Sequence, residues 1–262
     1  LQAASGATPG PTRKSRSLLF EKSPSIFPRH LAVSDQRVMI KGMRFALSFF
    51  LCLAFGAPSV FADLPLLPKE NHAAWQAVGR INASGYRSRE MCTGVLVAPD
   101  QVLTAAHCLA GTDGIGPVPE EITFAAGWLQ GQAADAVPGA AVWVHPKAYA
   151  SGRLDIRFDI ALLTLARPSH IAPLPVADAA SAAPFALLGY SMRRPHMLGA
   201  AFDCPGQFVD GLLRLGCAVI PGNSGGPVFT DVDGTWTVTA VVSAMGNAGA
   251  LAVPVTRLDA AQ

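Results

Sequence analysis

The sequence predicts an all-β fold, and three observations lead to this prediction. From about residue 63 onward, the 262-residue chain consists of short apolar or alternating runs separated by Gly, Pro, Asp and Asn. The runs contain many β-branched residues, and no long amphipathic helix is apparent. Many short strands at this spacing are typical of a β-sandwich or barrel rather than of alternating strands and helices.

The expected strands follow one another along this part of the chain. They are "CTGVLVAP" (92–99), "QVLTAAHC" (101–108), "ITFAAGWL" (122–129), "AAVWVHP" (140–146), "IALLTLARP" (160–168), "FALLGY" (185–190), "LLRLGCAVI" (212–220), "GPVFT" (226–230), "TWTVTAVVSAM" (235–245) and "LAVPV" (251–255). The segment 166–178 is rich in proline and has little periodicity, so it predicts a linker between two β units, at about 63–165 and 179–262.

The first 62 residues have a different composition. Residues 1–38 are rich in Pro, Ser and Arg, and we expect them to be disordered or not part of the natural product. Residues 39–62 contain Lys41 and Arg44, then an uncharged run of 18 residues that ends at Ala62. This layout predicts a signal peptide cleaved after Ala62, because a Gly/Pro break precedes the small residues; the alternative is a membrane anchor of minimal length. The protein is therefore expected to be secreted or periplasmic, with no stable membrane association after cleavage.

The charge balance argues against nucleic acid as a partner. Residues 63–262 carry 12 Lys+Arg and 16 Asp+Glu, a net charge of −4, although the whole chain has a net charge of +2. The excess positive charge thus belongs to the segment that is expected to be removed, and no basic domain remains to bind phosphates.

Four cysteines remain after the signal peptide, which itself contains Cys52. An even number in an exported protein predicts disulfides, and three pairings are possible. The local one joins Cys92 to Cys108 and Cys204 to Cys217, and each short loop would stabilise the fold by roughly 3 kcal/mol on the chain-entropy model. A zinc site is disfavoured because no C-x-x-C pair occurs, so no metal is expected.

Three short motifs contain the residue types that amide hydrolysis through a serine requires. These are a hydroxyl, an imidazole that takes its proton, a carboxylate that orients the imidazole, and backbone N–H donors for the oxyanion. The candidates are His107 in "LTAAHC", Asp159 in "FDIALL" and Ser224 in "GNSGGP". The N–H groups of Gly222 and Ser224 are the expected oxyanion donors, because glycines permit the unusual dihedral angles of such a loop.

Together, and in the order His, Asp, Ser, these motifs resemble those of the trypsin/chymotrypsin-like serine peptidases. The similarity extends from about Cys92 to Val255. It implies two six-stranded antiparallel β-barrels with the active site in the cleft between them. Asp155 is a rival carboxylate, but only Asp159 directly precedes "IALL" as the family motif requires.

Two departures from the animal digestive members concern activation. In those enzymes an aspartate directly precedes the nucleophile, and this aspartate forms an ion pair with the new N-terminal ammonium after zymogen cleavage. This chain has Asn223 at that position. The chain also lacks an "IVGG"-like start and reads "WQAVGRINASGY" instead. Both features resemble the bacterial branch of glutamyl endopeptidase-like proteases, in which the oxyanion loop is held by other means.

The resemblance also indicates where the specificity pocket lies. Six residues before the nucleophile, where trypsin-type enzymes have a pocket aspartate, the chain has Ala218. An alanine offers no charge to bind Arg or Lys, so a preference for these residues is not expected. The expected pocket wall contains no histidine of the kind that glutamate-specific relatives use, and Ser243, Ala244 and Met245 would line it. A small or apolar substrate side chain is expected.

We therefore expect a monomeric serine endopeptidase that acts on proteins or peptides without a cofactor. One alternative is a non-catalytic binding protein on the same scaffold, although such proteins usually lack a triad member. Another is an HtrA-like quality-control protease, although that family has a PDZ module after the protease domain and few residues follow "LAVPV" here.

Overall fold

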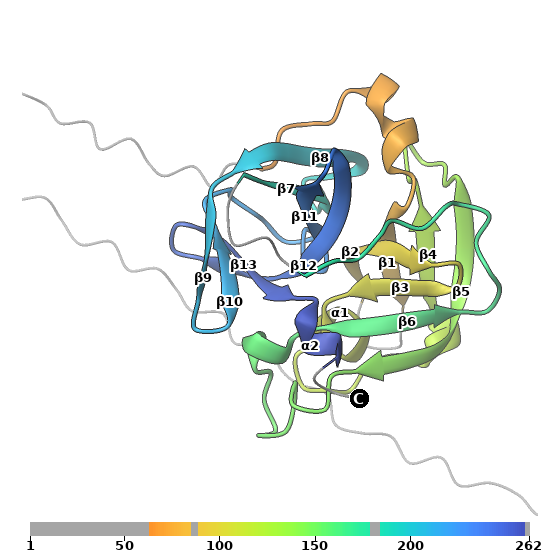
Figure 1. Cartoon of the computed structure of the whole chain (residues 1–262). Helices are drawn as coiled ribbons and strands as arrows, with labels where there is room; N and C mark the ends of the chain where they lie inside the picture. Colours follow the sequence, from red (N-terminus) through yellow and green to blue (C-terminus); the bar gives the residue numbers. More distant parts are fainter. Residues whose placement is uncertain (1–62, 85–88, 179–183, 260–262) are drawn as a thin grey trace, which may run out of the picture. The chain divides into compact units, whose positions relative to one another are not determined.

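A computed structural model of the chain describes residues 63–84, 89–178 and 184–259 (Figure 1). The predicted N-terminal extension 1–38 and signal peptide 39–62 lie outside the described residues. Among the residues that are described, no helix is long and apolar enough to span a bilayer.

The first six strands form a closed barrel in the order β1-β2-β3-β6-β5-β4. All neighbouring strands in it pair antiparallel. Its interior holds apolar side chains such as Ile81, Leu96 and Phe124. The strands are β1 (Val78–Ser84), β2 (Arg89–Ala98), β3 (Gln101–Thr104), β4 (Ile122–Ala126), β5 (Asp135–Val144) and β6 (Ala161–Leu165).

The second half forms an antiparallel sheet of seven strands in the order β8-β7-β11-β12-β13-β10-β9. Its strands are β7 (Phe185–Ser191), β8 (Arg194–Cys204), β9 (Gly206–Val209), β10 (Leu212–Leu215), β11 (Pro227–Val232), β12 (Thr235–Gly246) and β13 (Gly249–Pro254). The count of seven differs from the expected six because Pro205, which has no N–H to donate to a ladder, separates β8 from β9. Since β8 and β9 are the two edges of the sheet and adjoin at Pro205, the sheet curls round as in a barrel. The predicted chymotrypsin-like double-barrel fold is confirmed.

The short helices connect these strands. They are η1 (Lys69–Trp75), α1 (Ala106–Ala110), η2 (Pro119–Glu121), η3 (Ile156–Phe158) and α2 (Thr256–Asp259). The segment 166–178 contains no named strand, only an isolated bridge between Val176 and Val238 of β12.

Several predicted strands extend past the observed ends, and two of them include most of a segment that is not a strand. The segment "QVLTAAHC" was expected to be one strand, but β3 ends at Thr104 and α1 follows from Ala106. The segment "LLRLGCAVI" ends as a strand at Leu215, where the N–H of Gly216 donates to the Pro205 carbonyl and the chain bends. Three strands were missed, namely β1, β8 and β9, because glycines, prolines and charged residues interrupt their apolar alternation.

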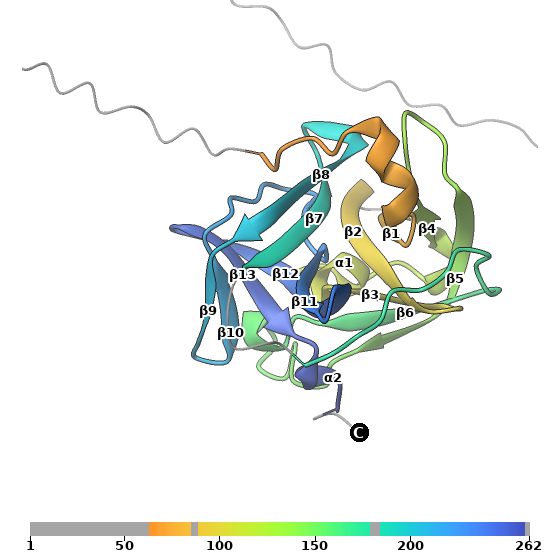
Figure 2. The same ribbon diagram turned by 45° about the horizontal axis from the view of Figure 1, so that its top comes forward.

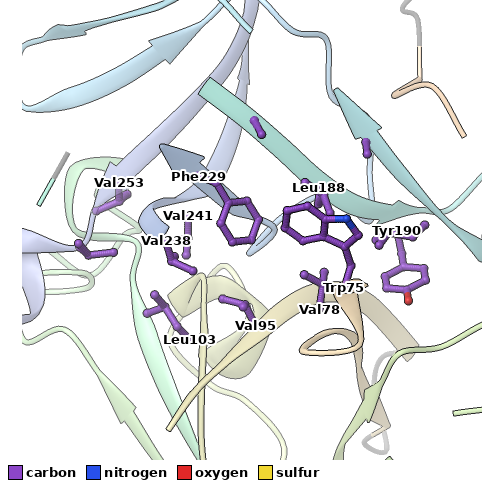
Figure 3. Close-up of a cluster of buried hydrophobic side chains, with 14 of the residues drawn as sticks. Trp75, Val78, Val95, Leu103, Leu188, Tyr190, Phe229, Val238, Val241 and Val253 are labelled. Carbon is purple, nitrogen blue, oxygen red and sulfur yellow. The ribbon is translucent and has the colours of Figure 1, made fainter. Parts of the chain in front are cut away.

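The interface between the two halves is a continuous apolar core (Figure 3). Val95 and Leu103 of the first barrel pack in the same cluster as Phe229 and Val241 of the second sheet. The ring of Trp75, from η1, lies 5.2 Å from that of Phe229. Burying apolar area of this kind from both halves holds them as one body and so fixes residues of one half against residues of the other.

Candidate active site

The three predicted catalytic residues lie on segments that the fold brings together. His107 is on α1, Asp159 directly follows η3 and lies two residues before β6, and Ser224 is in the loop between β10 and β11. His107 and Asp159 thus come from the first half and Ser224 from the second, as expected. Figures 1 and 2 show α1 where the first barrel meets the second sheet.

Asp159 binds His107 through two hydrogen bonds. Its Oδ1 accepts the backbone N–H of His107 at 2.9 Å, and its Oδ2 lies 2.7 Å from His107 Nδ1. Asp159 is completely buried, whereas 15% of the His107 side chain is exposed. Because a carboxylate only accepts, Nδ1 is the protonated nitrogen, and Nε2 is the basic one.

The same contact explains why α1 interrupts the predicted strand. The Asp159 carboxylate accepts an N–H in the first turn of this helix, where the helix has no backbone acceptor of its own. The residue at the usual capping position, Ala105, provides no side-chain hydrogen bond. A residue 52 positions away therefore caps α1, and a local pattern does not reveal it.

Ser243 has a different position from the one expected. It was predicted to line the substrate pocket, but it is buried and its Oγ donates to Asp159 Oδ2 at 2.6 Å. The carboxylate thus accepts from three donors. Since a buried polar group is stabilised by hydrogen-bond partners, Ser243 supports Asp159 rather than forming a free pocket surface.

The loop that carries Ser224 packs against the segment that leads into α1. Gly225 has a φ of +73°, and a Cβ atom there would lie 2.0 Å from Thr104 Oγ1 and 3.0 Å from the Ala105 nitrogen. The N–H of Gly225 donates to the Val242 carbonyl at 2.7 Å. Only glycine permits both this conformation and this approach, which brings Ser224 beside the start of α1.

The loop is also tied to the first barrel through Thr93 of β2. The N–H of Thr93 donates to the Ser224 carbonyl at 2.8 Å, and its Oγ1 donates to the Gly222 carbonyl at 2.8 Å. Gly222 has a φ of +100°. Within the part of the chain that the structure describes, the N–H groups of Gly222 and Ser224 have no protein acceptor. They are thus available to an oxygen atom of a bound molecule.

Asn223 uses both ends of its side-chain amide. Its Oδ1 accepts the N–H of Ile220 at 2.9 Å, and its Nδ2 donates to the Tyr190 carbonyl at 2.9 Å. The residue has no exposed surface. Tyr190 is buried too, which raises the pKa of its phenol well above the ordinary value. A neutral amide therefore organises the loop from within, at the position where animal relatives have an aspartate.

The rival carboxylate, Asp155, has a different partner. It binds Arg157 at the surface, with a shortest distance of 2.5 Å between Asp155 Oδ2 and Arg157 Nη2. Arg157 is also the main reason why the pKa of Asp155 lies below its ordinary value. Asp159 is the carboxylate that contacts His107.

A pocket of about 300 Å³ lies next to the Ser224 loop. Its lining consists of Met192, Arg193, Ile220, Pro221 and Met245. Met245 is thus the one predicted pocket residue in this lining, while Ala218 and Ala244 lie outside it. Four of its five lining residues are apolar, as expected for a site that binds an apolar side chain.

The structure pairs Cys92 with Cys108 and Cys204 with Cys217. Cys92, His107 and Cys108 lie close enough together to resemble a metal site. Two of these three residues share a disulfide, so neither supplies the thiolate that binds a metal ion. The disulfide instead connects α1, beside His107, to β2.

Sequence reasoning missed two residues of this site, Thr93 and Tyr190. Thr93 lies in the predicted strand "CTGVLVAP", directly after Cys92, but its partner Gly222 is 129 positions away. Tyr190 ends the predicted strand "FALLGY". Neither residue has a local signal that marks it as a support for the Ser224 loop.

Comparisons with known proteins agree with this geometry. A family model described as "Trypsin-like peptidase domain" matches residues 92–241, more than half of the chain. A protein called "Trypsin" from Saccharopolyspora erythraea is 32% identical over 93 residues, which are 35% of this chain and 37% of that protein. The match therefore spans little more than a third of that relative.

Two solved structures share the fold. The thermostable serine protease AL20 from an extremophilic microorganism has a TM-score of 0.61 and 16% identity, covering 72% of this chain and 95% of its own. The protease Anisep from Arthrobacter nicotinovorans has a TM-score of 0.60 and 19% identity, covering 71% and 93%. The family match, the fold and the position of the motifs within it agree, and the chain therefore belongs to the trypsin-like peptidase domain family, the serine-type peptidases that its three motifs indicate.

Proposed function

We propose that this protein is a serine endopeptidase that hydrolyses peptide bonds through an acyl-enzyme intermediate. The observation that carries the proposal is the contact between buried Asp159 and His107, which fixes the proton of the imidazole on Nδ1. His107 Nε2 then acts as the general base for Ser224 and, once protonated, as the acid for the leaving amine.

The remaining groups act on the oxygen of the scissile carbonyl. Attack by Ser224 Oγ converts this carbonyl into a tetrahedral intermediate with a negative oxygen. The N–H groups of Gly222 and Ser224 donate to that oxygen, and removal of one such donor typically lowers kcat by about 10²- to 10³-fold. Thr93 and Asn223 hold these donors in place before the substrate binds.

Active-site labelling with a fluorophosphonate probe tests the proposal. We expect one adduct at Ser224, located by mass spectrometry, that is absent in Ser224→Ala and forms much more slowly in His107→Ala. Ser151→Ala is a matched control, because Ser151 is exposed in a surface turn and lies outside the proposed triad. A folded protein that is not labelled would contradict the catalytic role and favour a binding function on this scaffold.

We also propose that the enzyme prefers a small or apolar side chain next to the cleaved bond. Met192, Ile220, Pro221 and Met245 supply the apolar lining of the pocket beside the Ser224 loop, and Ala218 offers no charge to an Arg or Lys side chain. A peptide library with varied residues before the cleaved bond measures this preference. Cleavage mainly after Arg, Lys or Glu would contradict it.

Export, a monomeric state and a glutamyl endopeptidase-like branch remain predictions from the sequence. The two disulfides support export, because such bonds persist in oxidising compartments. Asn223 supports the branch, because its neutral amide binds the Ile220 N–H and the Tyr190 carbonyl and so helps to hold the loop.

A further inference from the structure

The segment Asp63–Leu67 runs alongside β8 and pairs with it through backbone hydrogen bonds. The N–H of Leu67 donates to the Leu198 carbonyl at 2.9 Å, and the N–H of Ala200 donates to the Pro65 carbonyl at 2.8 Å. Figures 1 and 2 show this segment in orange, next to β8. Leu64 and Leu67 are buried in two of the apolar clusters. The segment therefore has a defined position on the second sheet.

Asp63 joins this segment to the turn between β7 and β8. Its Oδ2 accepts from Ser191 Oγ at 2.7 Å and from Arg194 Nε at 2.8 Å. The guanidinium of Arg194 also donates to the Leu64 carbonyl, and Ser191 Oγ accepts the N–H of Arg194 at 3.2 Å. Only 10% of the Asp63 side chain and 33% of the Arg194 side chain are exposed, so water screens this ion pair weakly.

The turn that Asp63 binds is in direct contact with the loop of the proposed oxyanion site. The N–H of Met192 donates to the Pro221 carbonyl at 2.8 Å. A Cβ atom on Gly222 would lie 2.8 Å from the Met192 nitrogen and 2.9 Å from Ser191 Cα. No space therefore separates Gly222 from the turn, and a shift of the turn moves the loop.

The same turn forms one side of the substrate pocket. Met192 and Arg193 line the pocket together with Met245. They lie between Ser191 and Arg194, the two residues that Asp63 binds. The Asp63 carboxylate thus holds both ends of the short segment that touches the pocket and the loop.

We propose that Asp63 is a positioning residue for peptide hydrolysis, which acts through Ser191 and Arg194 on the loop that contains Gly222. The inference rests on the proposed serine endopeptidase function and adds a residue that the three family motifs do not include. Oxyanion donors stabilise the transition state only when they are held within a few tenths of an ångström of their positions. Without the Asp63 carboxylate, the turn loses the acceptor shared by Ser191 and Arg194.

The test compares Asp63→Asn with Glu70→Gln in the full-length protein. Glu70→Gln also removes one negative charge, but from an exposed side chain in η1, seven residues after Asp63. The transition-state probe is a peptide boronic acid with an apolar side chain, because its tetrahedral adduct places an oxygen in the oxyanion site. The matched ground-state measurement is binding of an uncleaved peptide of the same sequence to each variant in a Ser224→Ala background.

We expect Asp63→Asn to lower kcat and the affinity for the boronic acid by about tenfold each, less than the loss of a whole oxyanion donor. Binding of the uncleaved peptide should change less than twofold, and Glu70→Gln should resemble the wild type. Arg194→Gln combined with Asp63→Asn should cost no more than either change alone, because the two side chains act as one unit.

Unchanged kcat in Asp63→Asn, measured in an active wild-type background, would overturn the inference and leave the proposed function intact. An equal loss of boronic acid and uncleaved peptide binding would also overturn it, because it would indicate general damage to the pocket. A loss of kcat that matches the unfolded fraction in a thermal melt would do the same. A wild-type protein that neither hydrolyses peptides nor reacts at Ser224 would refute the proposed function itself.

Discussion

Asn223 is a buried residue whose neutral side chain holds the loop around Ser224 from within. Its amide has one acceptor and one donor end, and the Ile220 N–H and the Tyr190 carbonyl match these ends. An aspartate has two acceptor oxygens, so one of them would face the Tyr190 carbonyl. The local environment thus specifies an amide at this position and disfavours a carboxylate.

We therefore predict that Asn223→Asp destabilises the protein by about 3 kcal/mol, the usual order of cost for a buried charge without a partner. It should also lower kcat/KM, because the displaced loop carries Gly222 and Ser224. Urea unfolding and peptide hydrolysis measure the two effects. Asn247→Asp, at an exposed position in the turn after β12, is the matched control and should behave like the wild type. Equal stability of Asn223→Asp and the wild type would refute this explanation.

At the scale of elements, Asp135 ties the first residues of the segment 166–178 to the start of β5. Its carboxylate binds Arg167 at 2.6 Å and accepts from Ser169 Oγ at 2.9 Å. The Asp135 side chain is almost fully buried, whereas half of the Arg167 side chain is exposed. These hydrogen bonds, led by that of Arg167, hold the pKa of Asp135 well below its ordinary value of 3.8.

This lowered pKa predicts a specific dependence of stability on pH. The stabilising contribution is fully present above the ordinary pKa of 3.8 and is lost as the pH falls from about 4 toward the lower pKa of the folded state. Asp135→Asn should reduce the free energy of unfolding at pH 7 by about 1 to 2 kcal/mol, since the exposure of Arg167 limits the strength of the pair.

Urea unfolding at several pH values between 7 and 2.5 measures this prediction. The difference between Asp135→Asn and the wild type should shrink as the pH falls. Asp113→Asn, in an exposed loop, should show no such difference. A gap between Asp135→Asn and the wild type that stays constant with pH would contradict the role of the ionised carboxylate.

At the scale of the whole molecule, one interface core and two disulfides hold the site together. The first barrel supplies His107 and Asp159, the second sheet supplies Ser224 and Ser243, and the apolar cluster in Figure 3 joins the two halves. Each disulfide closes a short loop, with sequence separations of 16 and 13. Of the two disulfides in the described residues, the one between Cys92 and Cys108 is adjacent to His107 of the proposed triad.

We predict that replacing either cysteine pair with serine lowers the free energy of unfolding by about 3 kcal/mol. The two variants should differ in activity at temperatures where both are folded. Loss of the Cys92–Cys108 bond should lower kcat, because α1 and His107 lose their link to β2, whereas loss of the Cys204–Cys217 bond should affect kcat less. Thermal unfolding and kcat measurements test this, and equal kcat values for the two variants would contradict it.

The sequence by itself determined the all-β class, most of the strands and the three motifs in their order. Apolar alternation, glycine and proline positions and short motifs are local, so they can be identified without knowing which segments meet. The local cysteine pairing was one of three that the sequence allowed, and the structure shows this one. The lengths of β3 and β10 and the existence of β1, β8 and β9 were not predictable in this way.

Only the tertiary structure decided which residues support the motifs. Ser243 donates to Asp159 across 84 positions, Thr93 donates to Gly222 across 129, and Ser191 donates to Asp63 across 128. Such contacts form because the closed barrel, the curled sheet and their common core bring distant segments together. A hydrogen bond depends on distance and direction in space, and the periodicity of the chain contains neither.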